Sequence, residues 1–415
     1  MKTLPVDLTI IGGGPAGMAA AVRAKQLGIR DILLLERDVE LGGILNQCIH
    51  DGFGLLRFKK QLSGAQYAQI FADMVYKEDV HVLTGAMVTD FNAGKIVTVT
   101  HSEQGTICLD SKSVVLAMGC RERTRNQVRI LGSRPAGVMT AGAVQRYINI
   151  SGYLPGKKAV ILGSGDIGLI MARRMRLEGM SVEGVYEVAP SPGGLRRNVV
   201  QCLDDYNIPL HLSHTVIKVH GCQRLEGVTV AQVDVTRRPV LGSERFIECD
   251  LLVLSVGLIP ENELSRQAGI TLDPSTNGPV VDNYMQTSIP GVFAAGNVSS
   301  VFDLVDYVSE TGEMAAEGAA KYLSGTGAGS DVRVFPGENV SLVLPQKIRR
   351  DDAFGRLYLR VSRFMRNVEL TVESGGVQLS RHRHAIAAPP EMLSLALPGA
   401  ALDSDVYVSV KEVPE

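Results

Sequence analysis

The chain has 415 residues, more than one ordinary hydrophobic core fills, so two or three domains are expected. Its 42 basic and 44 acidic side chains nearly balance, and 45% of its residues are hydrophobic, which excludes a disordered chain and a strongly charged nucleic-acid-binding surface. No run of 18 apolar residues is present, and the first residues lack the pattern of a signal peptide. We therefore expect a cytoplasmic protein without a transmembrane segment that works on small molecules.

The first predicted unit is a strand, a glycine-rich turn and a helix. The apolar strand VDLTII runs into Gly12, Gly14 and Gly17, a helical stretch follows, and a second strand ends at Glu36. In such a turn the first glycine permits the tight bend, the second lets the backbone approach a pyrophosphate, and the third allows close helix packing. The unpaired amides of the helix favour an anion, and the distal acid suits the adenosine ribose. The segment therefore predicts a dinucleotide site.

The second predicted unit repeats the first. The strand KAVILG leads into Gly163, Gly165 and Gly168, and the strand after the next helix ends at Glu187. The first glycine and the acid are 24 positions apart in both units, and the units are offset by 151 residues. One glycine motif is a weak signal, whereas two with the same flanking elements predict two dinucleotide folds.

Each unit continues with short alternating strands and closes on an apolar strand, SVVLAMG in the first and CDLLVLSVG, which ends at Gly257, in the second. This order predicts an α/β fold of two Rossmann-like domains, each a parallel sheet with an inserted antiparallel β-meander.

The last part of the chain differs in style. Glycine and serine gather near YLSGTGAGSD, which indicates a linker, and alternating strands follow around a turn at Gly375 and Gly376. We expect a small β-rich domain over residues 331–415 that docks a partner protein. It contains no cysteine, so it holds no iron–sulfur cluster.

The cysteines argue against a disulfide scaffold and a zinc site, because they are scattered without CxxC spacing. They are Cys48, Cys108, Cys120, Cys202, Cys222 and Cys249. We expect reduced thiols and no metal.

These motifs resemble the two-dinucleotide-binding-domain flavoproteins, the broad family that contains the pyridine nucleotide–disulfide oxidoreductases. The resemblance covers roughly residues 5–325 and rests also on SVVLAMGC, SVGLIPEN and TSIPGVFAAGN. It implies FAD in the first unit and a nicotinamide cofactor in the second. It also implies that Gly296 and Asn297 lie beside the flavin ribityl and pyrophosphate, and that the next helix points its N-terminus at the isoalloxazine ring. Asn297 replaces the aspartate that is usual in the family.

The resemblance gives the domain boundaries. An FAD-binding domain would comprise residues 1–125 and 280–328, an NAD(P)-binding domain residues 126–279, and the β-rich domain residues 331–415. The candidate cofactor-binding residues are Gly12, Gly14, Pro15, Ala16, Gly17, Glu36, Arg37, Gly42, Gly43, Val88, Ala117, Gly119, Gly163, Gly165, Asp166, Ile167, Gly168, Glu187, Gly257, Gly296 and Asn297.

NAD is favoured over NADP because the charge of Glu187 repels a 2′-phosphate. Arg196 and Arg197 leave NADP open, since arginines near such a site can offset that charge.

More narrowly, GGILNQCIHDGFG and PGGLRRNVVQCLDD resemble bacterial partner-dependent flavoproteins, akin to α-subunits of opine, sarcosine and hydrogen-cyanide-forming dehydrogenases. Members of this group are found beside a protein like anaerobic glycerol-3-phosphate dehydrogenase. The resemblance implies a complex in which this chain exchanges electrons with NAD(H). A partner flavoprotein dehydrogenase, a small cysteine-rich electron-transfer protein, or both would handle the other substrate.

Cys48 is the candidate catalytic residue, because in relatives the segment after Gly42 and Gly43 turns against the flavin. Disulfide reductases of the family carry two cysteines there and this chain carries one, which argues against dithiol exchange. Two alternatives to partner-dependent electron transfer stay open. One is a self-contained NADH oxidase or peroxidase that cycles Cys48 through a sulfenic acid. The other is an assembly component in which FAD is not catalytic.

Overall fold

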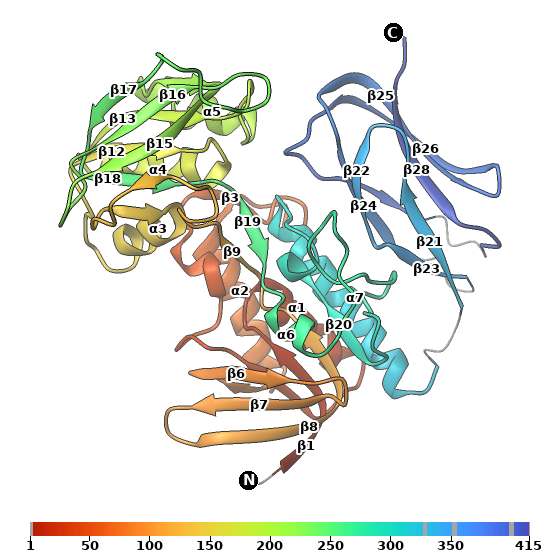
Figure 1. Ribbon diagram of the computed structural model, residues 1–415. Helices are drawn as coiled ribbons and strands as arrows, with labels where there is room; N and C mark the ends of the chain where they lie inside the picture. Colours follow the sequence, from red (N-terminus) through yellow and green to blue (C-terminus); the bar gives the residue numbers. More distant parts are fainter. Residues whose placement is uncertain (1–2, 327–329, 351–354, 398–401, 415) are drawn as a thin grey trace. The chain divides into compact units, whose positions relative to one another are not determined.

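The computed structural model describes residues 3–326, 330–350, 355–397 and 402–414 (Figure 1). Residues 327–329 of the expected linker, and residues 351–354, 398–401 and 415 of the expected β-rich domain, lie outside the described residues. The chain forms two compact units, Met1–Cys120 with Pro260–Glu415 and Arg121–Ile259. It passes between them twice, near the short strands β9 (Cys120–Glu122) and β19 (Leu258–Pro260).

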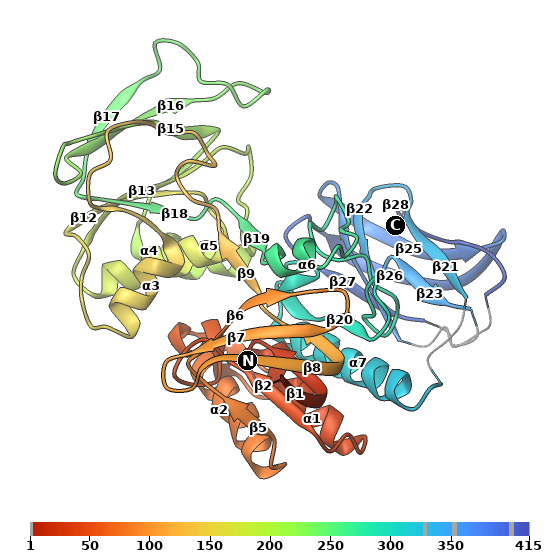
Figure 2. The ribbon, with the colours of Figure 1, turned by 60° about the horizontal axis from the view of Figure 1, so that its bottom comes forward.

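The first unit is built on one mixed sheet with the strand order β5-β2-β1-β8-β7-β6 and with β20 beside β8. The pairs β1–β2, β2–β5, β1–β8 and β20–β8 are parallel, and β6, β7 and β8 form an antiparallel meander whose strands lie side by side in Figure 2. The strands of this part of the first unit are β1 (Thr3–Ile11), β2 (Ile32–Leu35), β3 (Asp51–Phe53), β4 (Leu62–Ser63), β5 (His81–Leu83), β6 (Ala86–Phe91), β7 (Ile96–His101), β8 (Gly105–Leu116) and β20 (Val292–Ala294), of which β3 and β4 pair separately. Its helices are α1 (Pro15–Gln26), η1 (Gly43–Gln47), α2 (Gly64–Lys77), α6 (Glu263–Gln267), η3 (Gly296–Val298) and α7 (Val305–Leu323).

Small residues let α1 and α7 approach closely in this unit. A Cβ added to Gly312 of α7 would lie 2.2 Å from the carbonyl oxygen of Ala16 in α1. Only glycine fits at this position, and its lack of a side chain allows α7 to lie directly against the start of α1.

The second unit has a five-stranded parallel sheet, β11-β18-β12-β13-β14, and a separate sheet β10-β15-β16-β17 in which β15, β16 and β17 are antiparallel. Its strands are β10 (Leu131–Gly132), β11 (Val138–Thr140), β12 (Lys158–Leu162), β13 (Ser181–Glu187), β14 (Leu210–Leu212), β15 (His214–His220), β16 (Gly227–Gln232), β17 (Arg245–Glu248) and β18 (Leu251–Leu254). Its helices are α3 (Ala141–Asn149), α4 (Asp166–Leu177), α5 (Arg196–Cys202) and η2 (Asp204–Tyr206). The predicted pair of Rossmann-like folds with meanders is confirmed.

The tail is β-rich, as predicted, with the sheets β23-β21-β28-β25-β26 and β22-β24-β27. Its strands are β21 (Asp331–Pro336), β22 (Val340–Leu344), β23 (Lys347–Arg349), β24 (Arg356–Val361), β25 (Met365–Ser374), β26 (Val377–Ala387), β27 (Leu393–Ala396) and β28 (Val406–Glu412). Valine and leucine side chains from both sheets form a core of their own.

The tail also shares the main core of the first unit, to which Leu344, Tyr358 and Met392 belong. Arg349 and Asp282 form an ion pair of 2.9 Å across this junction, with side chains only 8% and 5% exposed. The tail is therefore an integral part of the first unit.

No helix among the residues described is both long and apolar enough to cross a membrane.

Candidate functional site

In the first glycine turn, the outer two glycines are required by the fold and the middle one by the ligand. Gly12 has φ +109°, and a Cβ there would lie 2.4 Å from the Ala117 oxygen, while a Cβ on Gly17 would lie 1.8 Å from the Gly12 oxygen. Nothing lies within 4 Å of the position that a Cβ on Gly14 would take. Gly12 and Gly17 are therefore required by the fold, whereas Gly14 leaves an open cradle at the start of α1. This arrangement fits a pyrophosphate approached by the backbone.

The second turn has the same design with tighter surroundings. Gly163 has φ +94°, and a Cβ there would lie 2.0 Å from the Ser255 oxygen, while a Cβ on Gly168 would lie 2.6 Å from the Ser255 Cβ. The middle glycine, Gly165, has only the Ser255 hydroxyl and carbonyl oxygens nearby, at 3.3 and 3.8 Å from an added Cβ. Ser255 was not identified from the sequence, although it directly follows β18, the closing apolar strand of the second unit, as Ala117 directly follows β8 in the first.

Glu36 is buried, with 6% of its surface exposed. Its Oε2 accepts a hydrogen bond from the Gly13 amide at 2.7 Å, and its Oε1 accepts one from the Asp38 amide at 2.8 Å. The carboxylate thus fixes the glycine turn against the end of β2. Each oxygen still has a lone pair that can accept a ribose hydroxyl.

Glu187 is 9% exposed and repeats this arrangement. Its Oε2 accepts from the Ser164 amide at 2.9 Å and the Ser164 hydroxyl at 2.7 Å, and its Oε1 accepts from the Ala189 amide at 2.9 Å. The equivalent residues of the two units are again 151 positions apart. This role in fixing the turn was not predicted from the sequence, which gave the acids only a ligand role.

The duplication extends to a pair of glycines that covers each turn, Gly42 with Gly43 and Gly193 with Gly194. The Gly42 amide donates to the Gly13 oxygen at 2.9 Å, and the Gly193 amide donates to the Ser164 hydroxyl at 2.8 Å. A Cβ on Gly43 would lie 3.2 Å from the Gly14 Cα, so the first pair lies directly against the first cradle. Gly42 and Gly43 were predicted from the sequence, whereas Gly193 was missed, although the 151-residue offset locates it.

The residues that begin the two helices differ. Pro15 starts α1, where the missing amide hydrogen costs nothing. Asp166 starts α4, and its Oδ1 accepts from the Leu195 amide at 2.8 Å and from the Asn198 side chain at 2.7 Å. Asp166 therefore holds the segment after Gly194 against the second turn.

The other candidates fall into three groups. Buried positions are Ala16, Val88 and Ala117, and Ile167 is partly buried against the core of the second unit. Glycines with positive φ are Gly119, at +74°, and Gly257, at +99°. Arg37 is exposed just beyond Glu36.

Gly296 and Asn297 lie at the carboxyl end of β20, beside the end of β8, because Ala294 pairs with Leu116. The Asn297 Oδ1 accepts from the Phe302 amide at 3.0 Å, and its Nδ2 donates to the Cys120 sulfur at 3.5 Å. The amide group therefore has a defined orientation. Cys120 was not identified from the sequence as part of this group.

Cys48 is half-buried after η1, and its thiol donates to the Ile44 oxygen at 3.4 Å. A Cβ on Gly64, the first residue of α2, would lie 2.6 Å from the Cys48 Cβ. The cysteine thus packs against the start of α2. All six cysteines lie within the described ranges, and none forms a disulfide.

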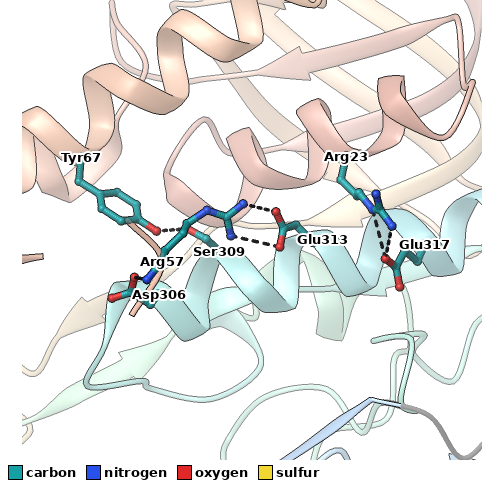
Figure 3. A network of polar contacts seen from close by, with 7 residues as sticks. All are labelled: Arg23, Arg57, Tyr67, Asp306, Ser309, Glu313 and Glu317. Atoms are coloured by element: carbon teal, nitrogen blue, oxygen red, sulfur yellow. Dashed lines mark hydrogen bonds and ion pairs between the residues drawn. The ribbon is translucent and has the colours of Figure 1, made fainter. Parts of the chain in front are cut away.

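The segment after Cys48 is tied to α7 by polar contacts (Figure 3). The Arg57 amide donates to Asp306 at 2.9 Å, and the Arg57 guanidinium pairs with Glu313. The hydroxyls of Tyr67 and Ser309 are 2.8 Å apart, and burial raises the pKa of Tyr67, so its hydroxyl keeps its proton. One side of α7 is thereby fixed to the cysteine-bearing segment. Further along the helix, Arg23 of α1 pairs with Glu317 at 2.7 Å.

Two dinucleotide turns, each after a parallel strand of a separate sheet, define an oxidoreductase of the flavin and nicotinamide class. The chain belongs to the pyridine nucleotide-disulphide oxidoreductase family, whose sequence model matches residues 6–320. It is an FAD-dependent oxidoreductase that uses NAD(P)(H), and the open cradle at Gly14 and the buried acid Glu36 fit such a dinucleotide.

Individual relatives are about a quarter identical to this chain over the aligned part. Hydrogen cyanide synthase subunit HcnB of Pseudomonas protegens is 26% identical in an alignment of 324 residues that covers 72% of this chain and 67% of the relative. An opine oxidase subunit of Agrobacterium tumefaciens is 27% identical over 71% of this chain, which spans only 61% of that relative. The thioredoxin reductase structure from T. acidophilum has a TM-score of 0.61 at 26% identity, and the match covers 77% of this chain and 99% of that one.

Proposed function

We propose that this chain is the NAD(H)-linked, FAD-containing component of a partner-dependent oxidoreductase. A hydride passes between the nicotinamide and the flavin, and electrons pass between the flavin and a partner redox protein. The observation that carries the proposal is the pair of glycine turns with buried acids, combined with a single cysteine in the segment after Gly42 and Gly43. This combination suits two dinucleotides and lacks the neighbouring second thiol of a dithiol reductase. The relatives named as subunits support the partner.

FAD, when bound, supplies the hydride acceptor and the electron donor. The chain itself therefore has to bind the cofactors, orient them and exclude water from the site. The Gly14 cradle and the amides at the start of α1 would hold a pyrophosphate, and Glu36 would accept hydrogen bonds from the ribose hydroxyls. Asn297, oriented by the Phe302 amide, would have a further side-chain N–H to offer to a bound flavin. In the second unit, Gly165 and Glu187 perform the same tasks for the nicotinamide dinucleotide.

Glu187 is the basis for proposing NAD rather than NADP. Glu187→Gln keeps the shape of the side chain and removes its charge, so the value of kcat/KM for NADH is expected to fall about 10-fold or more, as for a lost hydrogen bond to a charged group. The NADPH/NADH preference should rise, because the 2′-phosphate is no longer repelled. Steady-state reduction of a small artificial acceptor measures both values.

The matched control for this variant is Glu183→Gln. Glu183 lies on the same strand, β13, and its carboxylate accepts from the nearby Ser181 hydroxyl at 2.8 Å. The Glu183→Gln variant should leave both kcat/KM for NADH and the NADPH/NADH preference unchanged. A Glu187→Gln enzyme with the NADH and NADPH constants of the wild type would remove the assignment of this acid to the ribose.

The single-cysteine alternative makes a different prediction. Under partner-dependent transfer, purified protein reacts slowly with NADH and oxygen or peroxide, and Cys48→Ser keeps NADH-driven reduction of the flavin. Under the peroxidase alternative, Cys48→Ser abolishes a fast peroxide turnover. The observation that favours testing this alternative is the packing of Cys48 at the start of α2, because a helix N-terminus makes a thiol more reactive. Rapid peroxide-dependent NADH oxidation that is lost in Cys48→Ser, and kept in Cys222→Ser, would contradict the leading proposal.

The tail remains the proposed docking element for the partner. Truncation after Tyr322 is a poor test, because it would uncover the shared core around Tyr358 and leave Asp282 without Arg349. Substitutions at exposed positions of the edge strand β26 are expected to keep the fold, and Val377→Ser is suitable because this side chain is 63% exposed. Loss of a purified partner's binding in that variant, with NADH reduction of the flavin intact, is the expected result.

A further inference from the structure

The tail also holds α7. Glu310, in the second turn of the helix, accepts a hydrogen bond from the Arg356 Nε at 2.8 Å and one from the Tyr358 hydroxyl at 2.8 Å. Both donors lie on β24. Figure 3 depicts the attachment of α7 to the segment after Cys48, through Arg57 and Asp306, so the start of α7 is fixed by polar contacts from two separate parts of the chain.

Tyr358 is the centre of this attachment, with none of its surface exposed. Its ring makes edge contacts with Phe302, at 5.3 Å between centroids, and with Tyr307, at 5.2 Å. Burial, with the neighbouring Glu310 carboxylate, raises the pKa of the Tyr358 hydroxyl well above its usual range. The hydroxyl therefore stays a hydrogen-bond donor to Glu310 at neutral pH.

Phe302 links Tyr358 to the cofactor segment. Its backbone amide donates to the Asn297 Oδ1 at 3.0 Å, while its side chain packs on the Tyr358 ring. The neighbouring residues are held as well, since Arg360 donates to the Val301 oxygen at 3.1 Å and the Met392 amide donates to Asp303 at 3.1 Å. The connection from the tail to Asn297 thus consists of a ring contact and one hydrogen bond.

We propose that Tyr358 is a positioning residue for the flavin site, through which the tail fixes Phe302 and the orientation of the Asn297 amide. This inference rests on the proposed place of Asn297 beside the flavin. It gives the β-rich tail a task in addition to partner docking: the tail sets the affinity and the environment of the flavin.

Tyr358→Phe tests the inference, because it removes the hydroxyl that anchors the Tyr358 ring to Glu310 and leaves a less firmly held ring against Phe302. The FAD dissociation constant should rise on the order of threefold to tenfold, as expected for a residue that modulates a site through a network. The visible absorption spectrum of the bound flavin should also change, because the Asn297 amide is less well fixed. Both are measured at a temperature where the variant is fully folded. Phe302→Leu should produce the same two changes, and the double variant should be less than additive.

Tyr407→Phe is the matched control, since Tyr407 belongs to the same domain and is 51% exposed; it should change neither quantity. Asn297→Asp distinguishes a failure of the positioning role from a failure of the site assignment. If it alters the flavin spectrum and Tyr358→Phe lowers only the melting temperature, Tyr358 is merely structural and the inference is overturned, while the site assignment stands. If neither variant alters the flavin, the placement of Asn297 is wrong and the inference falls with it.

Discussion

Replacing Gly14 by alanine is expected to leave a folded protein that has lost most of its affinity for FAD. The added Cβ meets no atom of the chain within 4 Å, so the fold tolerates it, but it fills the cradle that the backbone offers to the pyrophosphate. Lost hydrogen bonds to a charged phosphate cost about 1.5 to 3 kcal/mol, or roughly 10- to 100-fold in the dissociation constant. Titration of apoprotein with FAD, followed by flavin fluorescence, measures the loss, and circular dichroism verifies the fold.

Two further glycines serve as controls for this experiment. Gly165→Ala should keep FAD and impair reduction by NADH, because it alters the turn of the second unit. Gly17→Ala should fail to fold, since its Cβ would lie 1.8 Å from the Gly12 oxygen. An FAD affinity that falls in Gly165→Ala and stays unchanged in Gly14→Ala would reverse the assignment of the two cofactors.

The second large effect is on stability. Arg349→Met is expected to lower the free energy of unfolding by about 3 to 5 kcal/mol, because it leaves the buried Asp282 carboxylate without its partner. The Arg349 guanidinium also stacks over Tyr284, at 4.8 Å from the ring centroid. The backbone amide of Arg349 donates to the Asn283 side chain at 3.0 Å. Urea unfolding of FAD-saturated protein gives this quantity.

The matched control is Arg381→Met, which removes an exposed partner of Glu369 on the β25–β26 hairpin. An exposed pair contributes less than about 1 kcal/mol. If Arg349→Met were no more destabilising than Arg381→Met, the tail would not be anchored to the first unit by this pair.

The duplicated parts of the site were predictable because their chemistry is local. The distances between Gly12 and Glu36, and between Gly163 and Glu187, are set by one strand, one turn and one helix, so the sequence spacing carries the geometry. The same offset would also have located Gly193.

The contacts that combine distant segments were not predictable in this way. No motif or periodicity links Tyr358 to Glu310 or Arg349 to Asp282. Both contacts depend on how the tail packs on the rest of the first unit. The tail has the alternation of an independent β domain, and this pattern does not reveal that Leu344 and Tyr358 complete another core. The contact of Asn297 with Cys120 follows from the pairing of β20 with β8, which single-sequence patterns do not specify.

The most direct test of two cofactors on one chain is an anaerobic titration of the FAD-loaded protein with NADH. The proposal predicts that the yellow colour is lost with one NADH per flavin, and that oxidised partner protein restores it. A protein that stays colourless after incubation with FAD, or a bound flavin that NADH and NADPH both leave oxidised, would contradict it.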